Sequence, residues 1–162
     1  MLRGDAYAAE NTRLKVDLEK VERAIADYSD TIKYAPEDRQ CYLSRARAVR
    51  VKALKLSLSD KRQLDSNLDR AISDLDRAVT LSPPEDKDFL ASAFEYLGHC
   101  YREKGKKSAQ KAIENHTKSL EYRPSGFVYS RRALVYEELL GDHERAKADR
   151  KKATVLESSP PK

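Results

Sequence analysis

The sequence is poor in the residues that mark disulfide-rich, membrane-spanning and aromatic-rich proteins. It contains no tryptophan, one methionine, two cysteines and five glycines in 162 residues. Cys41 and Cys100 each fall within a predicted helix. Two isolated cysteines of this kind are expected to be small buried residues that stay reduced in a cytosol, rather than part of a disulfide scaffold or a metal site. No apolar run is longer than a few residues, so none is long enough to cross a bilayer as a helix.

The opening residues 1–5 also lack the apolar stretch of a secretory signal, so we expect a cytoplasmic location. Motifs that carry chemistry are missing too. The three histidines, His99, His116 and His143, lie in different segments without a partner at metal-ligand spacing. No glycine-rich phosphate loop, nucleophile elbow or zinc-protease motif occurs. We therefore predict a protein that is not an enzyme and that uses no cofactor or metal.

Charged residues are abundant, at 36% of the chain against 40% apolar residues. This composition is typical of a helix-rich domain with a large surface, and the length is that of one domain with a real core. Lysine and arginine exceed aspartate and glutamate by 32 to 27, a net charge of +5. Nucleic acid is therefore an alternative partner, but acids are interleaved and no basic-aromatic stacking motif occurs, so it is the weaker alternative.

Residues 94–124 define a pattern of two helices separated at Gly105. Large residues three and four apart place one apolar stripe on each helix, and small residues allow the two helices to approach closely. A proline ends the unit because it cannot continue a helix. The residues of the pattern are Phe94, Leu97, Gly98, Tyr101, Ala112, His116, Ser119 and Pro124.

The same spacing recurs along nearly the whole chain. Its second half recurs three times, with the following residues at the matching positions: Ala24, Tyr28, Thr31 and Pro36; Ala71, Leu75, Ala78 and Pro83; Ala146, Arg150, Ala153 and Ser158. Its first half recurs with Tyr42, Arg45, Ala46 and Val49, with Tyr129, Arg132, Ala133 and Tyr136, and in shortened form with Arg3, Gly4 and Tyr7. Repetition in register favours a solenoid over a generic helical bundle, which needs no repeated positions.

These motifs resemble the tetratricopeptide repeat, whose signature is an aromatic residue, a Leu-Gly pair and a Tyr, followed by Ala, an aromatic residue and Pro. The resemblance implies an all-α fold, a right-handed α-solenoid of about four antiparallel helix hairpins. We predict a single domain over residues 1–157, with repeats at about 1–37, 38–84, 85–124 and 125–157, followed by a frayed tail at 158–162. The shortened first repeat predicts either a truncated cap or a piece of a longer array.

Two repeats depart from the common spacing. In the first, extra turns over residues 9–21 are expected, with the helices joined near Asn11-Thr12. In the second, an insertion near residues 52–65 predicts a helix prolonged to about Ser57 and another beginning near Asp65-Ser66. The insertion carries Lys52, Lys55, Lys61 and Arg62. It is either a solvated extension or a contact specific to this protein. Arg150, which replaces an apolar or aromatic residue, predicts that the solenoid ends at the fourth hairpin, since terminal repeats need a polar outer face.

The resemblance also implies where a partner binds, because the first helix of each hairpin lines the concave face of such solenoids. Positions beside and one turn after the small residue face this groove. The predicted groove residues are Leu43, Arg47, Arg50, Glu95, His99, Arg102, Ser130, Leu134 and Glu137. The arginines, with His99 as a further candidate, would make the groove basic and suit an acidic peptide or chain terminus.

The predicted function is therefore a protein–protein interaction module, or adaptor, that holds a partner segment in a basic groove. The family's carboxylate clamp for heat-shock chaperones is not expected, because its lysines and asparagines are missing at the matching positions. The alternatives are a structural part of a larger scaffold, a self-associating subunit, or a nucleic-acid-binding accessory protein.

Overall fold

The computed structural model describes residues 17–56 and 60–158, and all regular structure in those residues is helical. The helices are α2 (Leu18–Tyr34), α3 (Arg39–Leu56), α4 (Lys61–Thr80), α5 (Lys87–Lys104), α6 (Ala109–Tyr122), α7 (Gly126–Leu134) and α8 (His143–Ser158), with a short 3₁₀ turn η1 (Lys106–Ser108) before α6 and a π-helical stretch η2 (Val135–Leu140) continuing α7. The predicted all-α class is confirmed.

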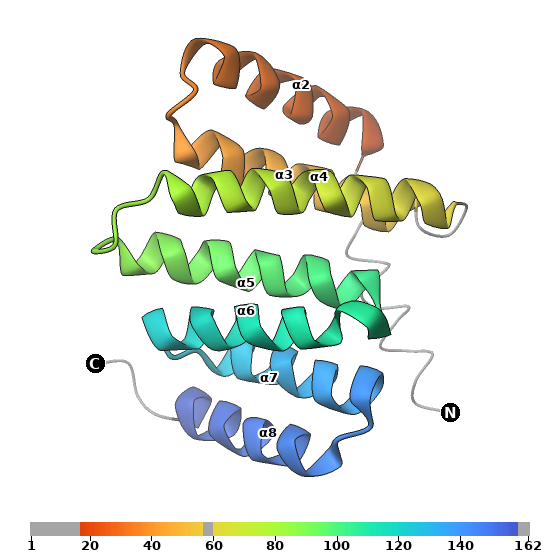
Figure 1. Ribbon diagram of the computed structural model, residues 1–162, viewed down its shortest axis with the longest axis vertical. Coiled ribbons are helices and arrows are strands. Elements are labelled where there is room, and N and C mark those ends of the chain that lie inside the picture. The colour runs from red at the N-terminus through yellow and green to blue at the C-terminus, as the bar shows by residue number, and fades with distance from the viewer. Residues whose placement is uncertain (1–16, 57–59, 159–162) are drawn as a thin grey trace.

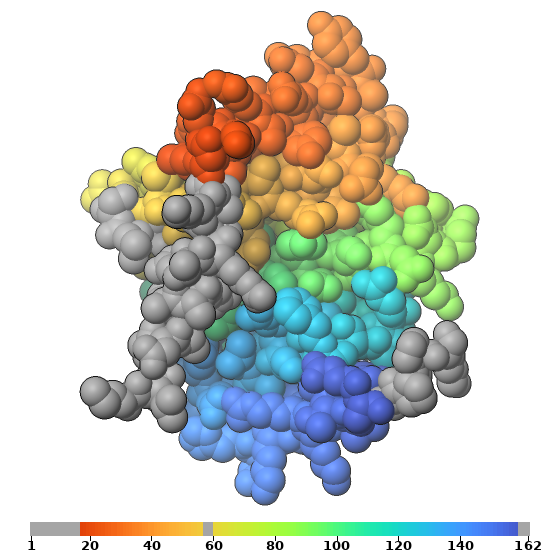
Figure 2. Space-filling view, turned by 180° about the vertical axis from the view of Figure 1, so that it is seen from behind, coloured from red at the N-terminus to blue at the C-terminus, as the bar shows by residue number. Residues whose placement is uncertain are grey.

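Consecutive helices pair as antiparallel hairpins, α3 with α4, α5 with α6, and α7 with α8 (Figure 1). Each hairpin packs on the next through its second helix, so the stack runs from α2 at one end to α8 at the other. Figure 2 shows the opposite side, again with α2 and α3 at one end and α8 at the other. The predicted solenoid of stacked hairpins is thus confirmed. The expected joint near Asn11-Thr12 and residues 159–162 of the expected tail lie outside the described residues.

Short polar side chains start the helices and two glycines end them. Asp17, Asp60 and Asp86 each accept hydrogen bonds from backbone N–H groups in the first turn that follows. Gly105 and Gly141 turn the chain at the third and fourth hairpins with φ of 93° and 69°, a region in which other residues are strained. The cap at Asp60 starts α4 at Lys61, four residues before the predicted Asp65, because its carboxylate binds the N–H groups of Arg62 and Gln63.

The recurring alanines of the three described hairpins are almost completely buried. Ala71, Ala112 and Ala146 on the second helices are each 0% exposed, and Ala46 and Ala133 on the first helices are at most 1% exposed. A methyl group at these positions lets the backbones approach while the neighbouring large side chains fill the space on either side.

Two of the hairpins contain the same buried polar lock, defined as an arginine held between two helices. Arg45 of α3 donates to both carboxylate oxygens of Asp74 on α4, at 2.8 and 2.7 Å, and to the Ser29 hydroxyl on the preceding α2, at 3.2 Å. The Ser29 hydroxyl in turn donates to the carbonyl oxygen of Ile25, so the guanidinium, the carboxylate and the hydroxyl of the lock all have hydrogen-bond partners.

The second polar lock repeats this geometry four helices later along the chain. Arg132 of α7 donates to both carboxylate oxygens of Asp149 on α8, at 2.7 and 2.8 Å, and to the Thr117 hydroxyl on α6, at 2.7 Å. The arginine and aspartate are 29 residues apart in the first lock and 17 in the second. The longer α3 and α4 therefore absorb the extra residues without disturbing the contact.

The α5–α6 hairpin has neither the arginine nor the aspartate of the lock. Leu97 and Asn115 stand at those positions, and the space is organised instead by Gly98 and His116. A Cβ atom on Gly98 would lie 2.4 Å from Nδ1 of His116, so the fully buried imidazole fits only because residue 98 has no side chain.

Within the described residues, no helix combines the length and the apolar character that a membrane span requires.

Candidate functional site

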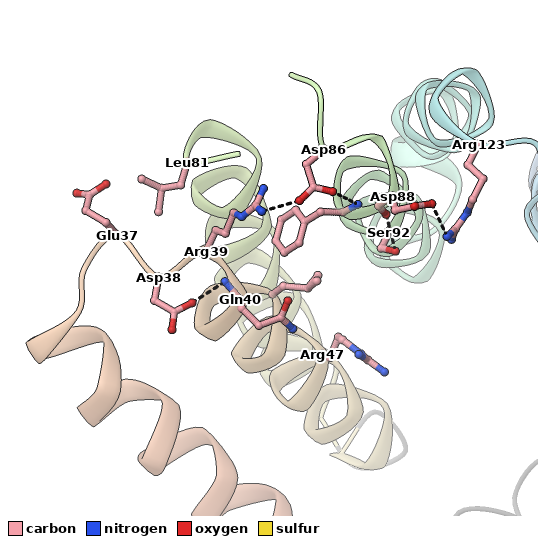
Figure 3. A pocket seen from close by; sticks show the side chains of 12 residues that line it. Glu37, Asp38, Arg39, Gln40, Arg47, Leu81, Asp86, Asp88, Ser92 and Arg123 are labelled. Carbon is pink, nitrogen blue, oxygen red and sulfur yellow. Dashed lines mark hydrogen bonds and ion pairs between the residues drawn. The ribbon is translucent and has the colours of Figure 1, made fainter. Parts of the chain in front are cut away.

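The first helices of the three described hairpins, α3, α5 and α7, form one continuous surface, which we call the first-helix face. α3 contacts α5 directly, and the His99 ring of α5 meets the Phe127 ring of α7. At the N-terminal ends of α3 and α5 this face opens into a cleft of about 700 Å³ (Figure 3). The cleft is lined by Glu37, Asp38, Arg39, Gln40, Leu43, Arg47, Leu81, Asp86, Asp88, Phe89, Ser92 and Arg123.

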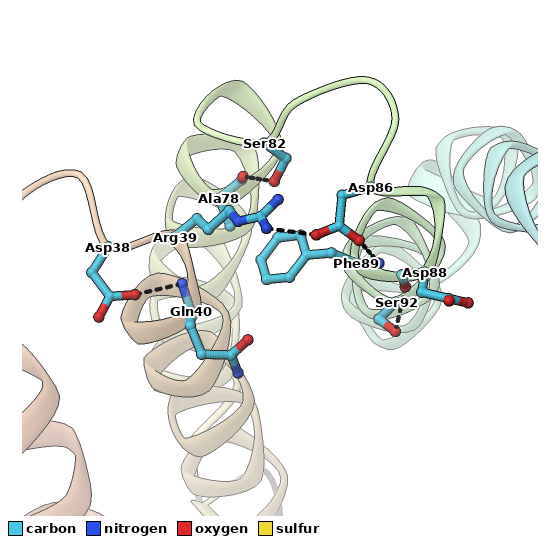
Figure 4. Close-up of polar contacts among 9 residues, drawn as sticks. All are labelled: Asp38, Arg39, Gln40, Ala78, Ser82, Asp86, Asp88, Phe89 and Ser92. Atoms are coloured by element: carbon cyan, nitrogen blue, oxygen red, sulfur yellow. Dashed lines mark hydrogen bonds and ion pairs between the residues drawn. The ribbon is translucent and has the colours of Figure 1, made fainter.

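Most charged side chains of the cleft are bound to one another. Arg39 donates to Asp86 at 2.5 Å and stacks on the Phe89 ring, with its guanidinium carbon 4.5 Å from the ring centre (Figure 4). Arg123 donates to Asp88 at 3.0 Å. The pKa of the Asp86 carboxyl is lowered, first by the N–H of Phe89 and then by Arg39. The Arg39–Asp86 pair links α3 to the start of α5 and shapes the cleft, whereas the Arg123–Asp88 pair at its rim is exposed.

Asp38 is likewise committed to the chain. It accepts hydrogen bonds from the N–H groups of Gln40 and Cys41 and from the Cys41 thiol, at 2.9, 3.2 and 3.2 Å. The thiol hydrogen bond is the largest cause of the lowered pKa of Asp38, and burial is the largest cause of the raised pKa of the Cys41 thiol. The cysteine is therefore a protonated donor that helps to start α3.

Two arginines of the first-helix face are held differently. Arg47 lies over the Tyr96 ring, 5.0 Å from its centre, and Arg131 lies over the Phe127 ring, 4.6 Å from its centre. The His99 ring bridges the two aromatic rings, with centroids 5.7 Å from Tyr96 and 6.1 Å from Phe127 and edge-to-face geometry at both. We call these five residues the arginine–aromatic row.

Neither Arg47 nor Arg131 forms an ion pair with a carboxylate of residues 17–56 or 60–158. Stacking on a ring fixes a guanidinium plane without using its N–H donors, because the contact is made through the face. Both groups are thus oriented cations whose five donors each are still available to a carboxylate.

Glu95 lies beside this row and makes no hydrogen bond or ion pair with the described residues. Burial raises the pKa of its carboxyl, and four arginines oppose this rise, in the order Arg123, Arg131, Arg47 and Arg50. Arg47 and Arg131 of the row, together with Arg123 and Arg50, therefore act on the Glu95 carboxylate through their charge and not through a direct hydrogen bond.

The structure places the other predicted arginines in ion pairs. Arg50 donates to Glu103 of α5 through Nε at 3.0 Å, and the two side chains are 20% and 12% exposed. Arg102 donates to Glu138 at 2.8 Å. A basic groove through these two residues would require unpaired guanidinium groups, and both groups are instead held in ion pairs. The reason is that each points toward an acid of a neighbouring hairpin, which spacing along one helix cannot reveal.

Leu43 and His99 do not offer the surface that was expected of them either. Leu43 lines the floor of the cleft but is only 4% exposed, because it belongs to the core cluster formed by α2, α3, α4 and α5. His99 is 8% exposed, and burial first, then Arg50, lowers its pKa to about 2, so the imidazole is neutral and adds no positive charge. Its two ring nitrogens have no hydrogen-bond partner among the described residues.

The predicted residues of the fourth hairpin lie at the far end of the first-helix face. Ser130 and Leu134 of α7 are half-buried, and Glu137 forms an ion pair with Arg150 of α8, with one contact at 3.4 Å. That pair also shows why Arg150 is tolerated where other repeats have an apolar or aromatic residue: its guanidinium reaches across its own hairpin.

Sequence reasoning missed Arg131, Tyr96 and Phe127. A signal was present in one case: Phe127 and Arg131 are four residues apart, the spacing at which two side chains meet on one helix. Tyr96 could not be found in this way, since its partner Arg47 comes from another hairpin.

No protein-family model matches this chain, and no curated protein does. Among solved structures, the chain is similar to the one described as the crystal structure of MamA, with 24% sequence identity, a TM-score of 0.48, and coverage of 97% of this chain and 95% of that one.

Proposed function

We propose that this chain is a non-enzymatic protein-interaction module whose first-helix face binds an acidic segment of a partner protein. The observation that carries the proposal is the pair Arg47 and Arg131, each stacked on an aromatic ring and each without a carboxylate partner among the described residues. Charge-assisted hydrogen bonds to such oriented guanidinium groups are about twice as strong as neutral ones.

The cleft provides the continuation of this binding surface. Arg47 belongs both to the cleft and to the arginine–aromatic row, so a segment bound to its guanidinium can extend toward Gln40 and Ser92 in one direction and toward Phe127 in the other. Phe127 is 47% exposed and offers apolar area beside Arg131. An extended peptide with two carboxylates and an apolar side chain between them fits this order of contacts.

The test compares peptide binding by the wild type with binding by the double variant Arg47→Gln, Arg131→Gln. An array of acidic peptides, each paired with its amide twin in which Asp and Glu are Asn and Gln, is probed by fluorescence anisotropy after nuclease treatment. Loss of two charge-assisted hydrogen bonds should weaken binding of the best acidic peptides by about tenfold or more. The amide twins should bind weakly to both proteins.

The matched control is Arg62→Gln, Arg70→Gln, which removes the same charge from exposed positions on α4. Equal weakening by both double variants would reduce the effect to net charge and contradict the proposal. The variant Glu95→Gln should change the affinity in the opposite direction. It removes a carboxylate that repels acidic peptides beside the row, so it should strengthen binding of the same peptides by a few-fold.

A further inference from the structure

The outer side of α8 has the same register as the surfaces on which the inner hairpins stack. In both polar locks the hydroxyl that receives the next hairpin lies five residues after the recurring alanine: Ser29 after Ala24 on α2, and Thr117 after Ala112 on α6. On α8 the residue five positions after Ala146 is Lys151, and it is exposed. No described helix lies beyond it (Figure 1).

This side of α8 is hollow and mainly apolar. A cleft of about 540 Å³ is lined by Pro124, Tyr129, Ala148, Lys151, Lys152, Val155 and Leu156. Val155 is 58% exposed and Leu156 is 39% exposed, two of the five exposed large apolar side chains among the described residues. We call this surface the α8 face. It lies at the far end of the stack from α2, and none of its lining residues belongs to the arginine–aromatic row.

The charges of the α8 face differ from those of the inner junctions. At the α2–α3 and α6–α7 junctions the arriving helix brings an arginine to a hydroxyl group, as Arg45 does to Ser29 and Arg132 does to Thr117. At the α4–α5 junction the same two positions hold Leu97 and Asp76. Lys151 would repel an arginine at that position and would attract a carboxylate. Lys152 lies 5.4 Å from the centre of the Tyr129 ring and adds a second positive charge at the edge of the apolar cleft.

From this register and charge we propose that the α8 face binds an amphipathic helix of a partner protein, one that carries an acidic residue beside its apolar stripe. Its apolar side chains fill the cleft between Tyr129 and Val155, as in other helix-in-groove contacts. Its carboxylate meets Lys151, at the position where the α2–α3 and α6–α7 junctions place an arginine against a hydroxyl. This site is independent of the acidic-peptide surface proposed above.

A charge-swap experiment on the full chain tests the site. The probes are two side-chain-stapled helical peptides about four turns long, a length at which a free helix is marginal and stapling keeps both equally ordered. Both have leucines at helical spacing. One has glutamates beside the stripe and its twin has lysines. The wild type should prefer the glutamate helix by about tenfold or more, and Lys151→Glu should prefer the lysine helix.

Lys147→Glu is the matched control, because it makes the same charge change on the same helix outside the cleft. It should keep the wild-type preference, and so should the Arg47→Gln, Arg131→Gln variant. Backbone NMR shifts on binding should be confined to α7, α8 and the Pro124 turn. Equal affinity for the two helices, no binding of either, or an unchanged preference in Lys151→Glu would overturn the proposal.

The competing occupant is a second copy of this chain. Sedimentation of the wild type and of Val155→Asp without peptide distinguishes it: the proposal requires that both remain monomeric. A dimer that is lost in Val155→Asp would assign the α8 face to self-association and overturn the proposal.

Discussion

The α5–α6 and α7–α8 hairpins join their two helices at the same sequence positions by two different kinds of contact. In α7–α8 a buried ion pair, Arg132 with Asp149, joins the two helices, and the side chains are 13% and 5% exposed. In α5–α6 the same two positions hold Leu97 and Asn115, and a close contact between Gly98 and the His116 ring joins the helices. The comparison teaches that the recurring spacing fixes where helices meet, and leaves open whether charge or shape makes the contact.

The largest expected effect comes from removing one member of the ion pair. Asp149→Ala leaves the Arg132 guanidinium buried without its carboxylate and should lower the free energy of unfolding by about 3–5 kcal/mol. Urea titration followed by circular dichroism measures this loss.

The double variant Arg132→Leu, Asp149→Asn places the two residues of the α5–α6 hairpin at the equivalent positions of α7 and α8. It should recover most of the lost unfolding free energy, since replacing a whole buried pair is often neutral. The Thr117 hydroxyl keeps its bond to the carbonyl oxygen of Ile113 in this variant. A double variant as unstable as Asp149→Ala would mean that the two hairpins are not interchangeable at these positions.

A smaller effect is expected at the contact of the α5–α6 hairpin. Gly98→Ala introduces a methyl group within 3 Å of the His116 ring and should cost about 1–3 kcal/mol by overpacking. His116→Ala in the same chain should remove the clash, so the two losses should not add in a double-mutant cycle. Additive losses would show that the glycine is required for another reason.

Acid should destabilise the α5–α6 hairpin before it affects the ion pairs. Burial lowers the pKa of His99 to about 2 and that of His116 to about 3, from an ordinary value of 6.5. The unfolded chain therefore binds more protons than the native chain below pH 6.5, and stability is complete above that pH and declines as the pH falls.

Each buried histidine should cost up to about 1.4 kcal/mol for every pH unit below 6.5. The arginines that face them, Arg50, Arg102, Arg131 and Arg132, stay charged throughout this range and oppose protonation. Unfolding midpoints between pH 7 and pH 5 measure the slope, and His116→Gln should reduce it. His143, which is exposed, is the control, and its replacement should leave the slope unchanged.

The smallest effect is expected where an ion pair of the α5–α6 hairpin is exposed. Asp88 and Arg123 are 80% and 48% exposed, so Asp88→Asn should change stability by less than about 1 kcal/mol. The same chemical change at Asp149 should cost several times more. Equal costs at the two sites would contradict the conclusion that burial determines the value of these pairs.

The architecture was predictable from the sequence because it depends on local rules. Alanines at fixed spacing, a proline at three repeat ends, and Gly105 and Gly141 at the turns act within a few residues, and the described residues fold into the stacked helical hairpins that such local signals predict. The start of α4 was missed because the cap at Asp60 was not recognised in a lysine-rich stretch.

The candidate site was less predictable because its properties depend on contacts between hairpins. Arg47 and Arg50 are one turn apart on α3, and nothing in the helix pattern distinguishes them. Glu103, 53 residues away, binds Arg50 and leaves Arg47 to stack on Tyr96. Which arginine is open to a partner is decided by the neighbouring hairpin.

The polar locks also bear on how the array arose. The sequence repeats alternate: the first and third repeats have Gly4 and Gly98 with an aromatic ring four residues after the alanine, and they supply the hydroxyl groups. The second and fourth have Ala46 and Ala133 and supply the arginines. Such alternation is what duplication of a two-hairpin unit would leave. A longer version of this protein should therefore be built by repeating α5–α8 as a block. An array of repeated α5–α8 blocks keeps the polar locks and should fold, whereas an array of one repeated hairpin lacks them.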